Sequence, residues 1–495
     1  MRNMCTIEKT SRNGSVDGQD LVLLCHKSTL LQCRSDILTD QWVFMPHHTL
    51  HERFESYLEE LAPLLGHADR VSSFKDYCYG LMMSLPRKSI EPMAASVDPA
   101  HVQARHQALH HLVAKSSWSD QALLTGVAQR VLPYMQTDTP RYWVIDDTAI
   151  RKKGRHSVGV SRQYCGEIGK QDNCQAAVSL SVATEQASLP VAWQLYLPTS
   201  WTDNPDRCRK AGVPAEVSFA TKPEIALQQI SQTLEAGIDP GIVLADAAYG
   251  KKTTWREQLF EWGLTYCVGV HEDLSVWAPG SDPLPSRWSG IGRPPNHLRK
   301  TNEDRPVSVK TLASSASADF QEVMWCEGTN KPLTSCFAAS VARGRKYREP
   351  EWLLIEWPQG ADEPSHYWLS NQPEQTSLKT LVSTAKARWR IERDYQELKQ
   401  EFGLDHYEGR NWRGFHHHAS LCIAAYGFLV AERLRCREQK KSHCSRHLRY
   451  PKITGQEGMQ RAQRHVSDSI RTLRWHLHQG IISVLSKRRF NFMTQ

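Results

Sequence analysis

The sequence predicts an α/β protein with four parts: an N-terminal helical domain, a core built on a mixed sheet, a β-rich insertion within that core, and a basic helical C-terminal region. Three observations lead to this expectation. Apolar residues recur at helical spacing before residue 138, and short β-rich apolar runs begin at residue 141. A segment rich in Pro, Gly, Ser and Trp then separates these runs from one more helical pattern.

The predicted boundaries follow these changes in pattern. Residues 1–44 lack periodicity and are expected to form an ill-ordered leader, so either Met1 or Met45 is a plausible start of translation. The other regions are a helical domain at 45–138, the core at 139–270 and 371–405, the insertion at 271–370 and the C-terminal region at 406–495.

The order of elements within the core predicts its fold. We expect three consecutive antiparallel strands, then a helix, a buried strand, a second helix, another strand, the insertion and one long helix. The corresponding residues are 142–145, 176–183, 189–197, 223–234, 242–245, 253–262, 265–270 and 376–402. This order is that of an RNase H-like fold with an inserted subdomain.

Composition and charge indicate a globular protein that binds a polyanion. No apolar run approaches the ~18–20 residues of a membrane span, and the N-terminus has no apolar signal segment, so we expect a cytoplasmic protein without a membrane partner. The 13 cysteines form no Cys-x-x-Cys pair, which favours reduced thiols over disulfides or a zinc site. Residues 433–495 carry a net charge of +12 and the rest of the chain −4, which favours nucleic acid over a merely solvated basic tail.

Three carboxylates at widely separated positions form the strongest candidate site. Asp146 and Asp246 each follow a short apolar run, where a strand is expected to end. Glu392 belongs to the last predicted helix of the core. Arg388 lies four residues before Glu392 and Lys399 seven residues after it, so the three side chains fall within roughly 40° on one helix face.

The first of these carboxylates has two candidates. If the strand runs through Asp146, alternation places Asp146 and Asp147 on opposite faces, and we prefer Asp146 with Asp147 left open. Carboxylate oxygens are the ligands that Mg²⁺ prefers. Three rigid carboxylates with cations nearby are what two-metal phosphoryl transfer requires.

Several basic and aromatic residues are candidates for contacts with nucleic acid. Lys152 and Lys153 follow the first aspartate and could grip phosphates, although a solvated hairpin tip is nearly as plausible. Arg410 and Arg413 flank a tryptophan, and this mixture of basic and aromatic groups is suited to binding DNA ends. The alternative is that these residues only form a loop between two helices. Trp288 is a candidate for stacking on a flipped base, against the commoner role of a core tryptophan.

The motifs resemble those of DDE transposases of bacterial insertion sequences, in the group with an RNase H-like core and a Tyr-Arg-Glu-Lys signature. In that signature two residues separate Tyr from Arg, three separate Arg from Glu, and six separate Glu from Lys. The positions that fit are Arg388, Glu392 and Lys399. The tyrosine position falls on Ala385, a departure that removes one expected phosphate or base contact. Asp146 in Asp-Asp-Thr and Asp246 in Ala-Asp-Ala-Ala-Tyr-Gly match the two aspartates of the group.

The resemblance implies a function and a set of partners. Asp146, Asp246 and Glu392 would hold two Mg²⁺ ions, for which Mn²⁺ would substitute. The helical domain at 45–138 would bind the terminal inverted repeats of the element. The enzyme would cut DNA and join the 3′-hydroxyl ends to double-stranded target DNA, as a homodimer in a paired-end complex. Relatives in this group resolve the second strand through a DNA hairpin.

Two other functions compete with this expectation. The first is a metal-dependent nuclease with the same fold and no strand transfer. The second is a catalytically inactive DNA-binding relic of a transposase, which the presence of all three carboxylates disfavours.

Overall fold

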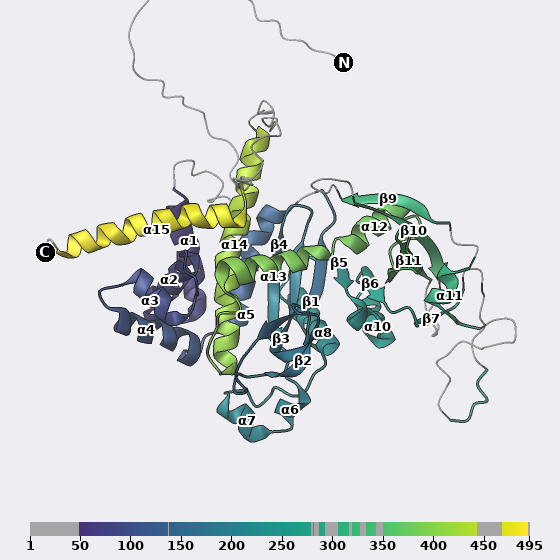
Figure 1. Cartoon of the computed structure of the whole chain (residues 1–495), viewed down its shortest axis with the longest axis horizontal. Coiled ribbons are helices and arrows are strands. Elements are labelled where there is room, and N and C mark those ends of the chain that lie inside the picture. Colours follow the sequence, from purple (N-terminus) through teal and green to yellow (C-terminus); the bar gives the residue numbers. More distant parts are fainter. Residues whose placement is uncertain are drawn as a thin grey trace, which may run out of the picture. The chain divides into compact units, whose positions relative to one another are not determined.

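A ten-stranded mixed sheet forms the core of the protein (Figure 1). The computed structural model describes residues 49–136, 138–278, 281, 287–292, 305–315, 319–326, 333–342, 350–442 and 468–493. The predicted leader at 1–44 lies outside these residues, as do parts of the predicted insertion and of the C-terminal region.

The first half of the sheet confirms the predicted RNase H-like strand order. β1 (Tyr142–Arg151), β3 (Lys170–Ala183) and β4 (Ser188–Leu195) form an antiparallel meander. β5 (Ile242–Ala245) pairs with β1 in parallel, and β6 (Tyr266–Val270) pairs with β5 in parallel. β5 and β6 are almost wholly buried, as expected for short apolar strands in a parallel sheet covered on both faces.

The strands of the insertion continue the same sheet. β12 (His366–Ser370) pairs antiparallel with β6, and β11 (Glu351–Trp357), β10 (Leu333–Ala342) and β9 (Gln321–Cys326) follow in that order. A small separate sheet of β7 (Ser275–Val276) and β8 (Val307–Ser308) leads into α11 (Val309–Ala313). The insertion is therefore β-rich, as predicted, and is joined to the core by backbone hydrogen bonds.

Helices dominate the chain before the sheet and cover parts of it afterwards. The N-terminal helices are α1 (Leu50–Leu61), α2 (Asp69–Met82), α3 (Ile90–Val97), α4 (Val102–His110) and α5 (Asp120–Val131). The later ones are α6 (Thr199–Thr202), α7 (Pro205–Lys210), α8 (Lys222–Glu235), α9 (Ala247–Gly250), α10 (Thr253–Glu261), α12 (Leu378–Lys386), α13 (Trp389–Phe402), α14 (Trp412–Ser442) and α15 (Ile470–Met493). Sequence signals mark several starts, such as the capping box of Thr49 and Glu52 on α1.

α14 joins the N-terminal helices to the sheet. It packs against α5 and α2 on one side and against β4 on another (Figure 1). Its residues 414–430 are all buried, so this stretch has no solvent-facing stripe. A single hydrophobic cluster consequently extends from α1 and α2 through α14 to β1, β5 and β6. Across the described helices, none combines the length and the apolar character that crossing a membrane requires.

The structure corrects two expectations about the core. The helix predicted at 376–402 is two helices, α12 and α13, because the bonding changes to the i→i+3 type where Arg390 and Ile391 donate to Ala387 and Arg388. Asp146 does not end its strand, because β3 supplies partners to β1 as far as the pair Arg151 and Cys174. A further strand, β2 (Ser161–Cys165), pairs with β3 and was not predicted.

Candidate active site

The register of two parallel strands places two aspartates side by side. The pairing of β1 with β5 ends at Val144 and Leu244. Asp146 and Asp246 each lie two residues further along, which is the same face of the sheet at the same level. Adjacent strands are about 4.8 Å apart, so both carboxyl groups leave the sheet together at the carboxyl end of β5.

Asp246 is held by the turn that follows β5. It caps the short helix α9, with its Oδ1 accepting a hydrogen bond of 2.9 Å from the Ala248 amide. Gly250 at the end of α9 lies directly against β6, because a Cβ atom there would be 2.0 Å from the Gly269 carbonyl oxygen. The small residues after Asp246 thus allow close packing of α9 on the sheet, which fixes the position of the carboxylate.

α13 brings the third carboxylate to the same edge. Arg388, at the start of α13, donates from Nη1 to Asp146 Oδ2 at 2.6 Å and from Nη2 to Glu392 Oε1 at 3.2 Å. At its other end, Lys399 donates to the Ala149 carbonyl at 2.8 Å. α13 therefore lies along β1 with a cation contacting the strand at each end, and Lys399 does not reach the carboxylates.

Burial dominates the electrostatics of Asp146. Its side chain is 14% exposed, and loss of hydration raises its pKa to about 7. The Arg388 guanidinium opposes this shift, whereas the negative charges of Asp246 and Asp147 reinforce it. A positive charge at this position is what the cluster needs in order to keep its carboxylates ionised together.

Asp147 faces the opposite side of the sheet, as alternation along β1 requires. Its Oδ2 accepts from Lys222 Nζ at 2.6 Å, and its Oδ1 accepts from the Tyr249 hydroxyl at 3.4 Å. The carboxylate of Asp147 therefore binds side chains of α8 and α9, on the face of the sheet opposite to Asp146.

A cavity of about 500 Å³ opens beside these residues. Asp246, Arg388 and Glu392 line one side of it. The other side is aromatic and basic, and its members are Trp325, His366, Trp368, Trp389 and Lys386. Sequence reasoning missed these aromatic residues because they come from β9, β12 and α13 and meet only in the folded chain. Trp288, predicted to stack on a base, is 52% exposed and is not part of this lining.

The remaining predicted cations lie elsewhere. Lys152 donates to the Tyr407 carbonyl at 2.6 Å, and burial lowers its pKa to about 8. Lys153 is exposed on the turn after β1. Arg413 donates to the Lys115 carbonyl at 2.9 Å, and Arg410 lines a separate cavity. The structure thus brings Arg388 to the carboxylates but not these four.

The donor set suits a hard divalent cation. Three carboxylates offer only oxygen ligands, which Mg²⁺ and Mn²⁺ favour. Asp146 and Asp246 are fixed by the sheet, whereas Glu392 is 63% exposed and can change its rotamer. In the part of the chain that the structure describes, no three His, Cys, Asp or Glu side chains converge closely enough to hold an ion. Arg388 occupies the position between Asp146 and Glu392, so ion binding requires its guanidinium to move.

The three consecutive histidines on α14 are structural. Buried His418 accepts from the Tyr77 hydroxyl at Nδ1 (2.8 Å) and donates from Nε2 to the Gly403 carbonyl (2.9 Å). Burial lowers its pKa to about 4, so the ring is neutral at physiological pH. His416 and His417 bind other backbone groups, and the three rings diverge around the helix.

Comparison with known proteins gives two matches. A family model described as DDE superfamily endonuclease matches residues 60–332, more than half of the chain. This range includes Asp146 and Asp246, and Glu392 lies beyond it. The probable transposase for insertion sequence element IS701 from Microchaete diplosiphon is 30% identical over 210 residues, which are 42% of this chain and 51% of that protein. The chain thus spans about half the length of this curated relative, and the match of the family model shows that the chain belongs to the DDE superfamily of endonucleases.

Proposed function

We propose that this protein is a DNA transposase of an insertion sequence, with Asp146, Asp246 and Glu392 as its catalytic carboxylates. The observation that carries the proposal is the register of β1 and β5, which sets two aspartates of distant sequence at one edge of the sheet. Arg388 then ties the third carboxylate to the first. The family match and the similarity to a probable transposase support the same reading.

The proposed chemistry is phosphoryl transfer at a DNA phosphodiester. Two divalent cations, Mg²⁺ in the first instance, would activate the attacking oxygen and stabilise the leaving oxygen when bound to the three carboxylates. Arg388 would exchange its carboxylate partners for a phosphate oxygen, which a guanidinium binds in the same forked geometry. The buried position of Asp146 keeps water away from one side of the site and strengthens these contacts.

The aromatic side of the cavity gives a role to the insertion. Trp389, which is 44% exposed, and half-buried Trp325 offer flat surfaces on which an unpaired base next to the cut can stack. Trp368, by contrast, is buried and stacks on His366. Lys386 lies 4.9 Å from the centre of the Trp325 ring and 5.5 Å from that of Trp368. Its ammonium group is paired with Glu356 at 2.7 Å, so it would have to leave that carboxylate to contact a phosphate beside the base. A DNA hairpin intermediate would need such support, and this cavity replaces Trp288 as the proposed location.

The finer parts of the function rest on the resemblance. They are recognition of terminal inverted repeats, joining of the 3′-hydroxyl to target DNA and a homodimer in a paired-end complex. The net charge of +12 on residues 433–495 supports a large DNA contact surface.

The test is cleavage of DNA that carries the terminal repeat of the element, with Mg²⁺ or Mn²⁺ supplied. We expect cleavage at the repeat boundary, and its loss by at least about 100-fold in Asp246→Asn and Glu392→Gln with DNA binding retained. Asp147→Asn is the matched control, since its carboxylate is adjacent in sequence but on the other face of the sheet. Loss of cleavage in Asp147→Asn but not in Asp146→Asn would reverse the assignment of the first carboxylate.

The competing functions give different outcomes in the same assay. Addition of target DNA yields joined products with a transposase and only cut ends with a nuclease. Tight repeat binding without any cleavage in either metal would identify an inactive relic.

A further inference from the structure

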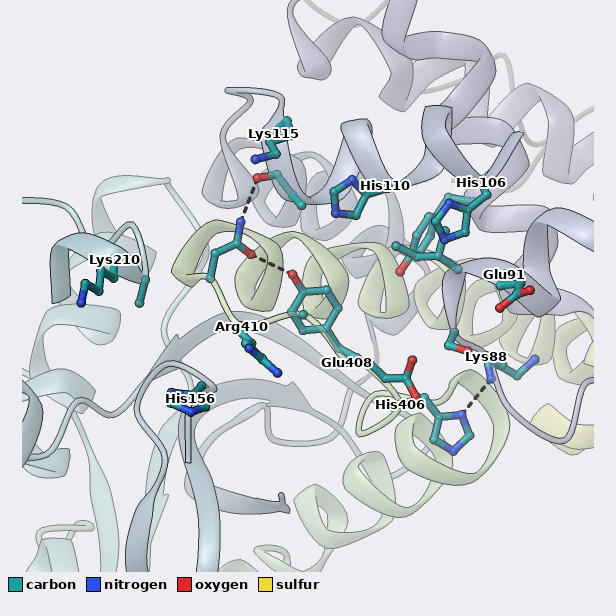
Figure 2. Close-up of a pocket in the computed structure, with 18 of the residues that line it drawn as sticks. Lys88, Glu91, His106, His110, Lys115, His156, Lys210, His406, Glu408 and Arg410 are labelled. Carbon is teal, nitrogen blue, oxygen red and sulfur yellow. Dashed lines mark hydrogen bonds between the residues drawn. The ribbon is translucent and has the colours of Figure 1, made fainter. Parts of the chain in front are cut away.

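A second cavity, of about 650 Å³, lies at the junction of five parts of the chain (Figure 2). Its walls come from the start of α3, from α4 and the turn after it, from α7, from the turn after β1, and from residues 406–411. It shares no lining residue with the cavity beside the carboxylates. It is therefore a separate feature of the surface.

The charge of this cavity is mainly positive. Three exposed cations line it, namely Lys115, Lys210 and Arg410, and their side chains have no hydrogen bond or ion pair among the described residues. Figure 2 shows Arg410 between Lys210 and His156 on one side and Glu408 on the other. Glu408 is paired with Arg87 at 2.5 Å, so its charge is already compensated.

Most of the other titratable lining groups are hydrogen-bond donors, and Glu91 adds one further negative charge. The imidazoles of His106, His110, His156 and His406 line the cavity. Lys88, by contrast, is turned inwards and donates to the Met83 carbonyl at 2.5 Å, so it belongs to the framework. The cavity thus offers several donors of mixed geometry, which suits an anion with several oxygens.

The walls are bonded to one another, so the backbone segments that carry the cations are held in place before a ligand arrives. Asn411 donates to the Ala114 carbonyl at 2.8 Å, and the Trp412 amide donates to the Ala211 carbonyl at 2.8 Å. The Val158 amide donates to the Arg410 carbonyl at 3.1 Å. Residues 410–412 therefore connect the N-terminal helices, α7 and the turn after β1. A preformed arrangement of this kind reduces the entropy lost on binding.

The distance between the cavity and the carboxylates can be estimated along β1. Arg151, at the end of the strand, lies five positions after Asp146, a span of about 17 Å. Residue 156, on the turn that follows, lines the cavity. Successive phosphates on one DNA strand advance about 3.4 Å along the axis, so 17 Å corresponds to about five nucleotides.

We propose that this cavity binds backbone phosphates of the DNA substrate about five nucleotides from the bond that is cut, with Arg410, Lys210 and Lys115 as the contacts. The proposal rests on the proposed function, because that function makes DNA the substrate. Such contacts carry no base information, so they would position the duplex and raise affinity for any sequence equally. Inorganic phosphate offers the same chemistry, and the experiment separates the two sources.

The experiment measures the affinity of the full-length protein for a terminal-repeat duplex and for an unrelated duplex, across a series of salt concentrations, without Mg²⁺. We expect Arg410→Ala and Lys210→Ala each to reduce the slope of log K against log salt by about 1, for both duplexes. Arg410→Lys should restore the slope, because it restores the charge. Arg209→Ala is the matched control: Arg209 precedes Lys210 on α7, is 78% exposed, pairs with Asp206 at 3.1 Å and does not line the cavity.

The possible outcomes separate this proposal from the proposed function. If Arg209→Ala changes the slope as much as Lys210→Ala, the salt dependence reflects the overall positive charge of this surface and not a contact in the cavity. The assignment of the cavity is then overturned. Calorimetric binding of inorganic phosphate that Arg410→Ala abolishes, with unchanged DNA slopes, would make this a free phosphate site and also overturn it. If the wild-type protein binds and cuts repeat DNA while all variants keep its slope, only this inference fails. Failure of the wild-type protein to bind DNA defeats both.

Discussion

A buried carboxyl group on α13 predicts how stability changes with pH. Asp394 is 1% exposed, accepts from the Ser188 hydroxyl at 2.6 Å and accepts from the Tyr426 hydroxyl at 3.0 Å. Burial raises its pKa to about 7, from an ordinary value of 3.8. These contacts join α13 to β4 and α14, so the state of this one proton acts on the helix that also carries Glu392.

The direction and size of the effect follow from proton linkage. Because the pKa of Asp394 is higher in the folded than in the unfolded state, the folded state binds the proton more tightly. The resulting stabilisation is fully present below about pH 4 and is lost as the pH rises through about 7. A difference of roughly three pKa units corresponds to about 4 kcal/mol of unfolding free energy.

Asp394→Asn tests this reasoning, since an amide of the same shape cannot ionise. Urea unfolding of both proteins at several values between pH 4 and 8 should show the variant gaining up to about 4 kcal/mol relative to wild type as the pH rises. Asp362→Asn, whose exposed carboxylate has no hydrogen bond or ion pair among the described residues, serves as a control and should show a nearly constant difference. A flat difference for Asp394→Asn would refute the argument and mean that the two hydroxyl donors keep the buried carboxylate ionised.

Three further predictions concern packing and hydrogen bonds. Gly250→Ala should displace α9 from β6, lower the melting temperature and abolish DNA cleavage, because the new Cβ would be 2.0 Å from the Gly269 carbonyl oxygen. Arg474→Ala should cost roughly 3 kcal/mol in urea unfolding, since this side chain, 12% exposed, pairs at 2.8 Å with a carboxylate of α13 and donates to two carbonyls at the end of α2. His418→Leu should cost roughly 2–4 kcal/mol in the same assay, because it leaves a buried tyrosine hydroxyl and a carbonyl unpaired.

Each of these predictions has a contrasting measurement. Gly166→Ala, where nothing lies within 4 Å of the new Cβ, should leave both melting and cleavage unchanged. For Arg474, a protease digest should remove α15 faster from the variant, and equal rates would contradict the proposed attachment. For His418, adding Tyr77→Phe should recover part of the loss, and a fully additive further loss would speak against the bond between the two side chains.

Local patterns were enough to predict the elements whose signals lie within a few residues. Two examples are β5 and the helix that ends before Gly263. The strand is marked by its own apolar run, and the helix end is marked by a glycine that adopts a left-handed conformation. The break between α12 and α13 was not predictable in this way, since neither proline nor glycine marks it. The length of β1 depends on pairing with β3, which lies some 30 residues further along the chain.

The sequence supplied candidate residues for the site but not their geometry. Spacing and the apolar runs before the two aspartates made Asp146, Asp246 and Glu392 candidates, although Asp146 lies within β1 and not at its end. The structure brings the two aspartates together through the register of β1 and β5. That Arg388 bridges two of the three carboxylates requires the orientation of α13, which no local pattern gives. The aromatic side of the cavity and the basic cavity of Figure 2 each combine segments separated by more than 50 residues.

The central position of α14 has a consequence for synthesis on the ribosome. About 280 residues separate the end of α5 from the start of α14, the helix against which α5 and α2 pack. At a translation rate of ~5–20 residues per second, α14 is synthesised roughly 15–60 s after the N-terminal helices. During this interval the faces of α2 and α5 that pack on α14 lack that partner, so the nascent chain is expected to be a client of chaperones. A transcript truncated before residue 412 would leave those faces exposed permanently, and its product would be a target for proteolysis.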